Sequence, residues 1–188
     1  MSRYDRLVPY HHGDLRRALL DAALDAVREK GLSGLSLREV ARRAGVSHAA
    51  PAHHFRDKAA LVTALAAEGW NRLADALHEA AGRGFGEVGV AYVLFATSNP
   101  AYFAVMRAPA GLVRGDDPEL RAAQKRAAEP LWAGSRRPDG THDPTMALAA
   151  WSLVHGLAIL ILEGAVTPEP GSDVATLARS VTGHLRRT

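Results

Sequence analysis

The stretch SLREVARRAGVSHAAPAHHFRDKAAL, residues 36–61, predicts a helix that ends in a sharp turn. Ser36 is followed three residues later by Glu39, and this Ser-x-x-Glu spacing is typical of a capping box at a helix start. We therefore expect a helix from Ser36 to about Ala44. Gly45 comes next, and glycine readily adopts the left-handed conformation with which many helices end.

The second half of this stretch contains two further helix starts. Ser47 is expected to be the N-cap of a third, short helix that continues to about His54. Asp57 is expected to cap a long helix from Lys58 to about Ala81. The stretch therefore predicts helix, turn, short helix and long helix in close succession.

The remainder of the chain also reads as helix. Alanine, leucine, arginine and glutamate dominate, and alternating β-branched runs are absent. Asp14 is expected to cap a first helix that ends at about Lys30, before Gly31, and Asp173 is expected to cap the last helix. Turns rich in glycine and proline separate further helices expected at residues 86–98, 100–107, 117–134, 144–163 and 171–186.

These elements predict an all-α fold. An N-terminal three-helix domain of the helix-turn-helix type is joined by the long helix to a C-terminal helical domain. We place the first domain at residues 1–58, with residues 1–11 as a flexible arm, and a ligand-binding and dimerisation domain at residues 59–188. The residues expected to face the interior of the first domain are Leu37, Val40, Ala41, Val46 and Phe55.

Composition limits the class of protein. The 188 residues include no cysteine, so disulfides and thiolate chemistry are excluded. The longest apolar run, Met146–Leu162, is at the short limit for a membrane span and contains Ser152, His155 and Gly156. Its flanks also lack the Lys/Arg cluster that orients a single span. A buried helix is therefore favoured over a membrane span, and the cytoplasm is the expected location.

Positive charge is concentrated in the N-terminal third. Residues 1–58 contain eleven Lys/Arg and seven Asp/Glu, whereas the other residues contain twelve and thirteen. Five of the nine histidines also lie in this third. Such asymmetry favours a polyanionic partner for the N-terminal domain, although a solvated charged surface would have the same composition.

The quoted stretch, with DLRRALLDAALDAVREKGLSGLS at residues 14–36, closely resembles the N-terminal domain of TetR-family transcriptional regulators. The matching features are the helix stop at Gly31, Ala41, the AGVS turn at residues 44–47, His54-Phe55, and Lys58 followed by Leu61. The segments NPAYFAVMRAP and AWSLVHGLAILILEG resemble the regulatory domain of a branch with a Trp-x-x-x-His-Gly signature, here Trp151, His155 and Gly156.

The resemblance implies an all-helical homodimer whose first three helices bind double-stranded operator DNA. Lys58 matches the family lysine that contacts a backbone phosphate, and Arg38 matches a position near the groove edge. Helix N-termini bind phosphate through free N–H groups, so the starts at Ser36 and Ser47 are candidates too. The residues best placed to contact bases through imidazole or methyl groups are His48, Ala49, Ala50 and His53.

Two residues of the third helix depart from expectation. Ala52 occupies the position where the family usually has a tyrosine that contacts phosphate. Pro51 lacks an N–H group near the start of the helix, which predicts a bend or a tighter first turn. An alternative therefore stays open, namely a helical ligand-binding or interaction protein with weakened or lost DNA reading.

The sequence gives little support to a metal site or an active site. His48, His53 and His54 are separated by five, six and one residues, whereas a helical pair needs i, i+4 to share a face, and no carboxylate or cysteine completes a ligand set. We expect His54 to pack beside Phe55, and no metal or other cofactor. The chain has no Gly-x-Ser-x-Gly and no phosphate-binding glycine loop, so an enzyme is not expected.

The C-terminal half is expected to bind an apolar small molecule and a second subunit. Spacing alone does not distinguish pocket residues from core, and the pocket candidates are Trp70, Tyr92, Phe95, Tyr102, Phe103, Met106, Trp132, Trp151 and His155. The helix at 144–163 is apolar nearly all round, as expected where one face meets a partner. Its interface candidates are Trp151, Gly156, Ile159 and Leu160. Together these features predict a ligand-responsive transcriptional regulator, with a repressor favoured and an activator left open.

Overall fold

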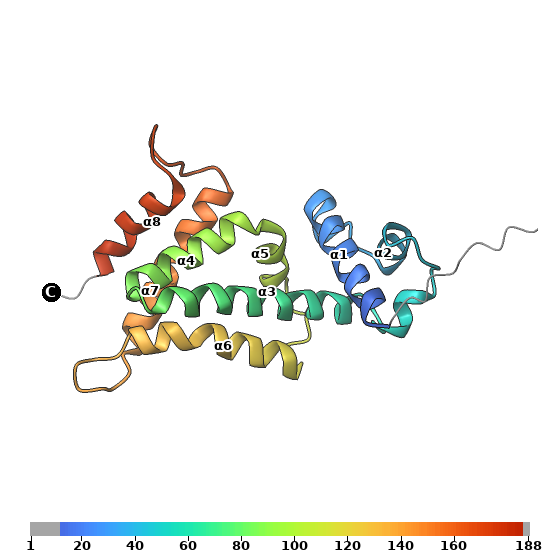
Figure 1. The fold of residues 1–188 in the computed structure, drawn as a ribbon, viewed down its shortest axis with the longest axis horizontal. Coiled ribbons are helices and arrows are strands. Elements are labelled where there is room, and N and C mark those ends of the chain that lie inside the picture. Colours follow the sequence, from blue (N-terminus) through green and yellow to red (C-terminus); the bar gives the residue numbers. More distant parts are fainter. Residues whose placement is uncertain (1–11, 186–188) are drawn as a thin grey trace, which may run out of the picture.

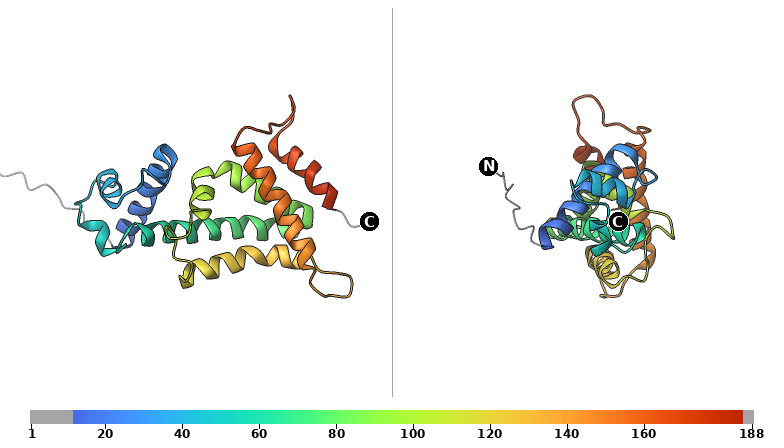
Figure 2. Two further views of the ribbon diagram at one scale, coloured as in Figure 1. Left: turned by 180° about the vertical axis from the view of Figure 1, so that it is seen from behind. Right: turned by 90° about the vertical axis from the view of Figure 1, so that its right-hand side faces the viewer.

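The computed structural model describes residues 12–185, which form eight α-helices and two short 3₁₀ segments (Figures 1 and 2). Residues 1–11, for which we expect a flexible arm, and residues 186–188 lie outside the described range. The elements are α1 (His12–Lys30), α2 (Leu37–Arg43), η1 (Ala50–His53), α3 (Lys58–Ala81), α4 (Phe85–Ser98), α5 (Pro100–Met106), α6 (Pro118–Gly134), α7 (Pro144–Leu162), α8 (Val174–Thr182) and η2 (Gly183–Leu185).

Helix α3 runs through the centre of the molecule and belongs to both of its halves (Figure 1). Helices α1 and α2 and the segment η1 lie around its N-terminal end. Helix α6 packs along the rest of α3, and α4 and α5 cover another side of it. Helices α7 and α8 pack on α4. The predicted all-α, helix-turn-helix architecture is confirmed.

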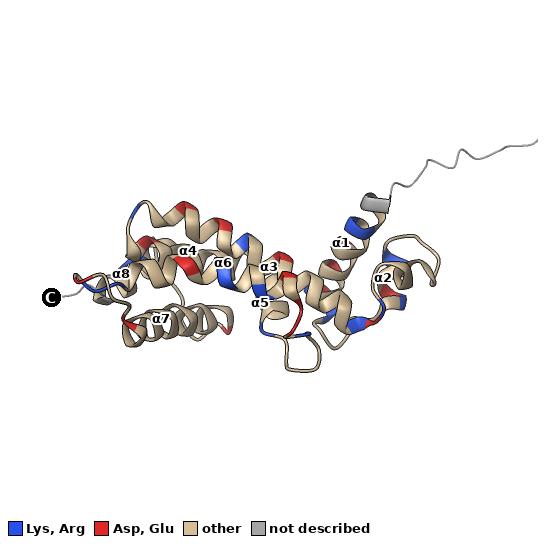
Figure 3. Ribbon diagram, turned by 90° about the horizontal axis from the view of Figure 1, so that it is seen from below, with Lys and Arg blue, Asp and Glu red and all other residues tan. Residues whose placement is uncertain are grey.

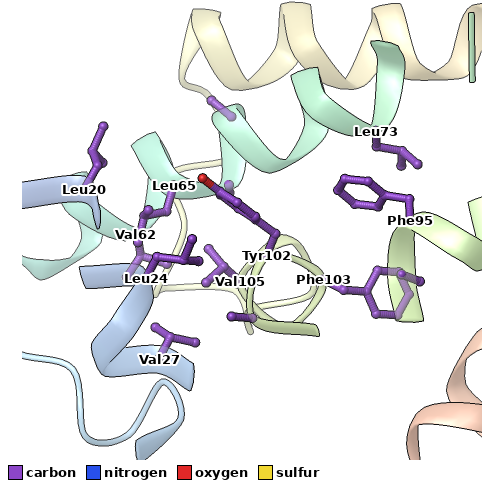
Figure 4. Close-up of a cluster of buried hydrophobic side chains, with 14 of the residues drawn as sticks. Leu20, Leu24, Val27, Val62, Leu65, Leu73, Phe95, Tyr102, Phe103 and Val105 are labelled. Atoms are coloured by element: carbon purple, nitrogen blue, oxygen red, sulfur yellow. The ribbon is translucent and has the colours of Figure 1, made fainter. Parts of the chain in front are cut away.

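A continuous hydrophobic core joins the N-terminal helices to the larger helical half (Figure 4). Burying an aliphatic side chain of this kind stabilises a fold by about 1.5–3 kcal/mol, so α1, α3 and α5 pack as one unit. At Gly69 of α3 the approach of α5 is close, because a Cβ there would lie 2.9 Å from the Met106 sulfur. The joining side chains come from α1, α3 and α5, and include Leu20, Leu24, Val27, Val62, Leu65, Tyr102 and Val105.

Side-chain caps begin most of the helices. In each case an oxygen accepts a hydrogen bond from the backbone N–H three residues later, and the capping residues are Ser36, Asp57, Asp117, Asp143 and Asp173. The caps predicted at Ser36, Asp57 and Asp173 are therefore confirmed. The cap predicted at Asp14 is wrong, because α1 begins at His12 and includes Asp14 in its first turn.

The third helix also differs from its prediction. It is the 3₁₀ segment η1, and not an α-helix capped by Ser47. Pro51 has no N–H to donate to the Ser47 carbonyl, which accepts a hydrogen bond of 3.0 Å from the Ala50 N–H instead. The residue that precedes η1 is Ala49, and its side chain makes no capping bond. The proline therefore sets the tighter turn.

Helix α7 is only partly buried. It contains no Asp, Glu, Lys or Arg, and within residues 12–185 it is the one single helix long and apolar enough to cross a membrane (Figure 3). Of its most apolar window, 28% is buried, so the prediction of a buried helix holds for one face alone. The other face exposes large apolar side chains, among them Leu148, Trp151 and Leu160.

Candidate nucleic-acid interface and internal cavity

The turn between α2 and η1 has the hydrogen bonds of a Schellman motif. The Gly45 N–H bonds the Arg42 carbonyl at 3.3 Å, and the Val46 N–H bonds the Ala41 carbonyl at 3.0 Å. Gly45 has φ 68°, a conformation that residues with a Cβ rarely adopt. The side chains that hold this unit together are buried or half-buried, as predicted, and are Leu37, Val40, Ala41, Val46 and Phe55.

After the turn, the chain presents small side chains and imidazoles to solvent. Pro51 is fully buried and fixes the segment to the domain core. Ala50 is half-buried, and the other residues of this exposed segment are Ser47, His48, Ala49, Ala52 and His53. His54 is half-buried with its ring 6.4 Å from that of Phe55, where the prediction places it. The candidate base-reading residues thus lie on a single short segment with a rigid anchor.

Glu39 neutralises most of the positive charge on α2. Its backbone N–H donates to the Ser36 oxygen at 3.2 Å, while its carboxylate binds Arg42 at 2.9 Å and Arg43 at 2.8 Å. Hydrogen bonds from Arg42 and then Arg43 lower the pKa of the Glu39 carboxyl, so it stays ionised. Arg38 is exposed and makes no ion pair or hydrogen bond within the described part of the chain, which leaves its guanidinium available to a phosphate.

Lys58 lies in the first turn of α3. Its Nζ donates to the Leu32 carbonyl at 2.8 Å, and the side chain is half-buried. An ammonium group has three donors, so this bond fixes the position of the charge and leaves donors for a phosphate. The Asp57 carboxylate, one residue earlier, accepts from the Ala60 N–H at 2.8 Å.

The start of α3 is tied to the loop between α5 and α6. Arg114 of that loop binds the Asp57 carboxylate at 2.6 Å, and its backbone N–H donates to the Thr63 hydroxyl at 2.9 Å. These contacts join residues 57 and 51 positions apart. The sequence offers no signal for them, because no periodicity relates a loop to a distant helix start.

A second polar cluster connects α1, α3 and α5 at Glu68. One carboxylate oxygen of Glu68 accepts from the Tyr102 hydroxyl at 2.7 Å and binds Arg17 at 2.7 Å and Arg72 at 2.8 Å. Burial raises the pKa of Glu68, but the bonds from Tyr102, Arg17 and Arg72 together lower it. Tyr102, a pocket candidate from the sequence, thus belongs to this cluster.

A cavity of about 390 Å³ lies between α3, α4, α6 and α7. Four of the nine pocket candidates line it, namely Trp70, Tyr92, Trp132 and Trp151. The Trp70 Nε1 is buried and has no hydrogen-bond partner among the described residues. Ordinary helical positions complete the wall, and the sequence does not distinguish them from core: Leu73, Leu77, Val88, Gly89, Gln124 and Ala128.

The other five pocket candidates lie outside this cavity. Phe95 and Phe103 are core residues, and Met106 packs at Gly69. The His155 Nδ1 lies 2.7 Å from the Tyr92 hydroxyl, so His155 supports the cavity wall from behind. Burial, and to a smaller degree the charge of Arg107, lowers the pKa of His155. The other candidate outside the cavity is Tyr102.

The interface candidates lie on or beside the exposed face of α7. Trp151 and Leu160 are 45% and 44% exposed, and Gly156 and Ile159 are half-buried. A Cβ added at Gly156 would meet no atom within 4 Å. A close contact inside the chain therefore does not explain this glycine.

Comparisons with known proteins identify the family. Residues 19–65 match the bacterial regulatory proteins of the tetR family, and residues 85–185 match the tetracyclin repressor-like C-terminal domain. The chain therefore belongs to the TetR family and is a DNA-binding transcriptional regulator. This family is regulatory and not enzymatic.

Individual relatives agree with this assignment. The HTH-type transcriptional regulator BetI of Klebsiella pneumoniae is 42% identical over 62 residues, a match that spans 33% of this chain and 32% of BetI. A structure of a protein of unknown function from Rhodococcus sp. RHA1 is 34% identical, with a TM-score of 0.74 over 94% of this chain and 96% of that one. NalD, the secondary repressor of the MexAB-OprM multidrug efflux pump in Pseudomonas aeruginosa, shares the fold at 22% identity and a TM-score of 0.59, over 92% and 94% of the chains.

Proposed function

We propose that this regulator is a repressor that leaves its operator when a small apolar molecule enters the cavity. The observation that carries the proposal is the continuity of α3. Its first turn contains Lys58, and its later turns supply Trp70, Leu73 and Leu77 to the cavity wall. A ligand that shifts α3 would therefore move the DNA-facing segment. Coupling of this kind is worth typically about 1–3 kcal/mol.

The proposed DNA contacts fall into two groups. Arg38, Lys58 and the helix start at Ser36 would bind backbone phosphates, since their donors are exposed or held near the surface. Ser47 would contribute its hydroxyl, because it does not begin an α-helix. The groups proposed to contact base edges in the major groove are His48, Ala49, Ala50 and His53.

A homodimer would complete the regulator. The exposed residues Leu148, Trp151 and Leu160 form the apolar part of α7 that a second copy would cover. Two DNA-binding segments about 34–36 Å apart would then fit successive major grooves. We place the division between the DNA-binding and the regulatory domains at residues 58 and 59, inside the first turn of α3, and the site of action in the cytoplasm.

One observation favours a second candidate, a regulator with weak DNA reading. Ala52 is exposed and offers a methyl group where the family usually has a tyrosine hydroxyl for phosphate. The 3₁₀ geometry of η1 also shortens the reading segment. The two candidates differ in the expected affinity for operator DNA.

Binding of the purified protein to the DNA upstream of its own gene tests the proposal. Specific binding should exceed binding to random DNA, and the neutral apolar probe N-phenyl-naphthylamine should lower operator affinity by about 5–150-fold, the usual range of coupling. Ala128→Phe, which fills the cavity, should abolish this effect of the probe, whereas Ala122→Phe on the exposed face of α6 should preserve it. No preference over random DNA would contradict the repressor.

A further inference from the structure

A second cavity, of about 520 Å³, lies at the end of the molecule opposite the DNA-binding segment. The start of α4, the end of α6 and the end of α8 surround it (Figure 1). Its walls differ from those of the apolar cavity. Three guanidinium groups line it, from Arg83, Arg136 and Arg179.

The charge of this second cavity is positive. Among the described residues that line it, Glu87 supplies the acidic group, and it binds Arg179 through two contacts of 2.9 and 3.2 Å. Hydrogen bonds from Arg179 lower the pKa of Glu87, so this pair is charge-balanced. Arg83 has a long contact of 3.9 Å to the exposed Glu79, and Arg136 donates to the Gly140 carbonyl at 3.0 Å. Their two positive charges exceed what the cavity wall itself neutralises.

The two cavities adjoin at Phe85. This residue lines both of them, and Gly134 lies against its ring, since a Cβ at Gly134 would be 2.0 Å from a ring carbon. On α7, Met146 lines the charged cavity and Ala150, one turn later, lines the apolar one. Rotation of one aromatic side chain would therefore join an apolar space to a cationic one.

We propose that the effector is an amphipathic anion, with an apolar body in the tryptophan-lined cavity and an anionic head group among the arginines. This inference rests on the proposed effector function of the first cavity. The apolar body gains from leaving water. The head group gains charge-assisted hydrogen bonds, for which the forked guanidinium is well suited. Neither part alone uses both cavities, so the class of ligand follows from their junction.

Three probes with one decyl chain test the head-group preference, namely decanoate, decanol and decylammonium. Binding is followed by tryptophan fluorescence, because Trp70, Trp132 and Trp151 line the apolar cavity. Decanoate should bind about tenfold more tightly than decanol, the gain expected from hydrogen bonds to a charged group, and decylammonium should bind least. Equal affinities for decanoate and decanol would overturn the inference.

Substitutions locate the head group. Arg83→Gln with Arg136→Gln should remove the preference for decanoate and change decanol binding by less than about twofold. Arg121→Gln, which removes the same charge from the far end of α6, should leave the preference unchanged. Ala128→Phe should weaken both ligands equally, because it fills the space for the shared chain. A preference that persists in the Arg83/Arg136 variant would place the head group elsewhere.

Operator binding measured with the same probes separates this inference from the proposed function. If decanol and decanoate bind equally and both release the operator, the effector function stands and the anionic head group is wrong. If decanoate binds with the expected preference and leaves operator affinity unchanged, the site is confirmed and the effector function fails. If no probe binds, both fail.

Discussion

Arg114, in the loop between α5 and α6, binds Asp57, the residue that caps α3, with its Nη2 2.6 Å from Oδ2. This contact joins the regulatory half to the residue immediately before Lys58. The side chains are 29% and 45% exposed, so water screens the pair and its own contribution to stability is modest. Its structural effect is to fix the start of the long helix relative to the loop.

The two roles of Asp57 can be separated by substitution. Asp57→Ala removes both the cap and the ion pair, and should lower the free energy of unfolding by about 0.5–2 kcal/mol. Asp57→Ser keeps a capping oxygen, and should cost about 1 kcal/mol or less, as should Arg114→Gln. Urea denaturation measures all three. If serine proved as costly as alanine, the cap would not be the main contribution.

A tyrosine at position 52 should strengthen DNA binding. Ala52 is exposed, so a larger side chain can be accommodated without disturbing the core. One hydrogen bond to a phosphate is worth about 0.5–1.5 kcal/mol, so Ala52→Tyr should raise operator affinity by roughly 2–10-fold. Ala52→Phe lacks the hydroxyl and should not do so. Equal gains in the two variants would attribute the effect to the ring.

Dimerisation through α7 predicts a specific effect at Gly156. Because a Cβ at this position meets no atom of its own chain, Gly156→Leu should leave the folded protomer intact and even gain about 1 kcal/mol of helix propensity. It should nevertheless shift the protein from dimer to monomer in sedimentation velocity. Ala122→Leu on exposed α6 is the matched control, and a dimer that persists in Gly156→Leu would place the interface elsewhere.

His155 should make stability depend on pH. Burial, then the charge of Arg107, holds its pKa below 6.5 in the folded protein, so the unfolded chain binds more protons below that pH. The contribution of His155 is therefore complete above pH 6.5 and is lost as the pH falls toward the folded pKa. In thermal unfolding over this range, His155→Gln should lose less stability than the unaltered protein. Parallel losses in both proteins would exclude His155 as the cause.

Local chemistry explains which parts of the fold the sequence predicts. The caps at Ser36, Asp57 and Asp173 and the turn at Gly45 depend on neighbouring residues, so their positions follow from short motifs. At Ser47 a cap signal competes with a proline four residues later, and the missing N–H prevails.

The cavities could not be predicted in this way. Trp132 and Phe103 have similar patterns of helical spacing, yet one lines a cavity and the other is core. Tyr102 is directed away from the cavity by Glu68, which lies 34 positions earlier in the chain. Such outcomes depend on how distant helices pack, and periodicity within one helix carries no information about that packing.

The salt dependence of operator binding tests the central claim most directly, because each phosphate contact releases counterions. Lys58→Gln and Arg38→Gln should each reduce the slope of log K against log salt concentration by about 1. Arg121→Gln, at the other end of the molecule, should leave the slope unchanged. Slopes that stay the same in the Lys58 and Arg38 variants would contradict the assignment of this surface to DNA.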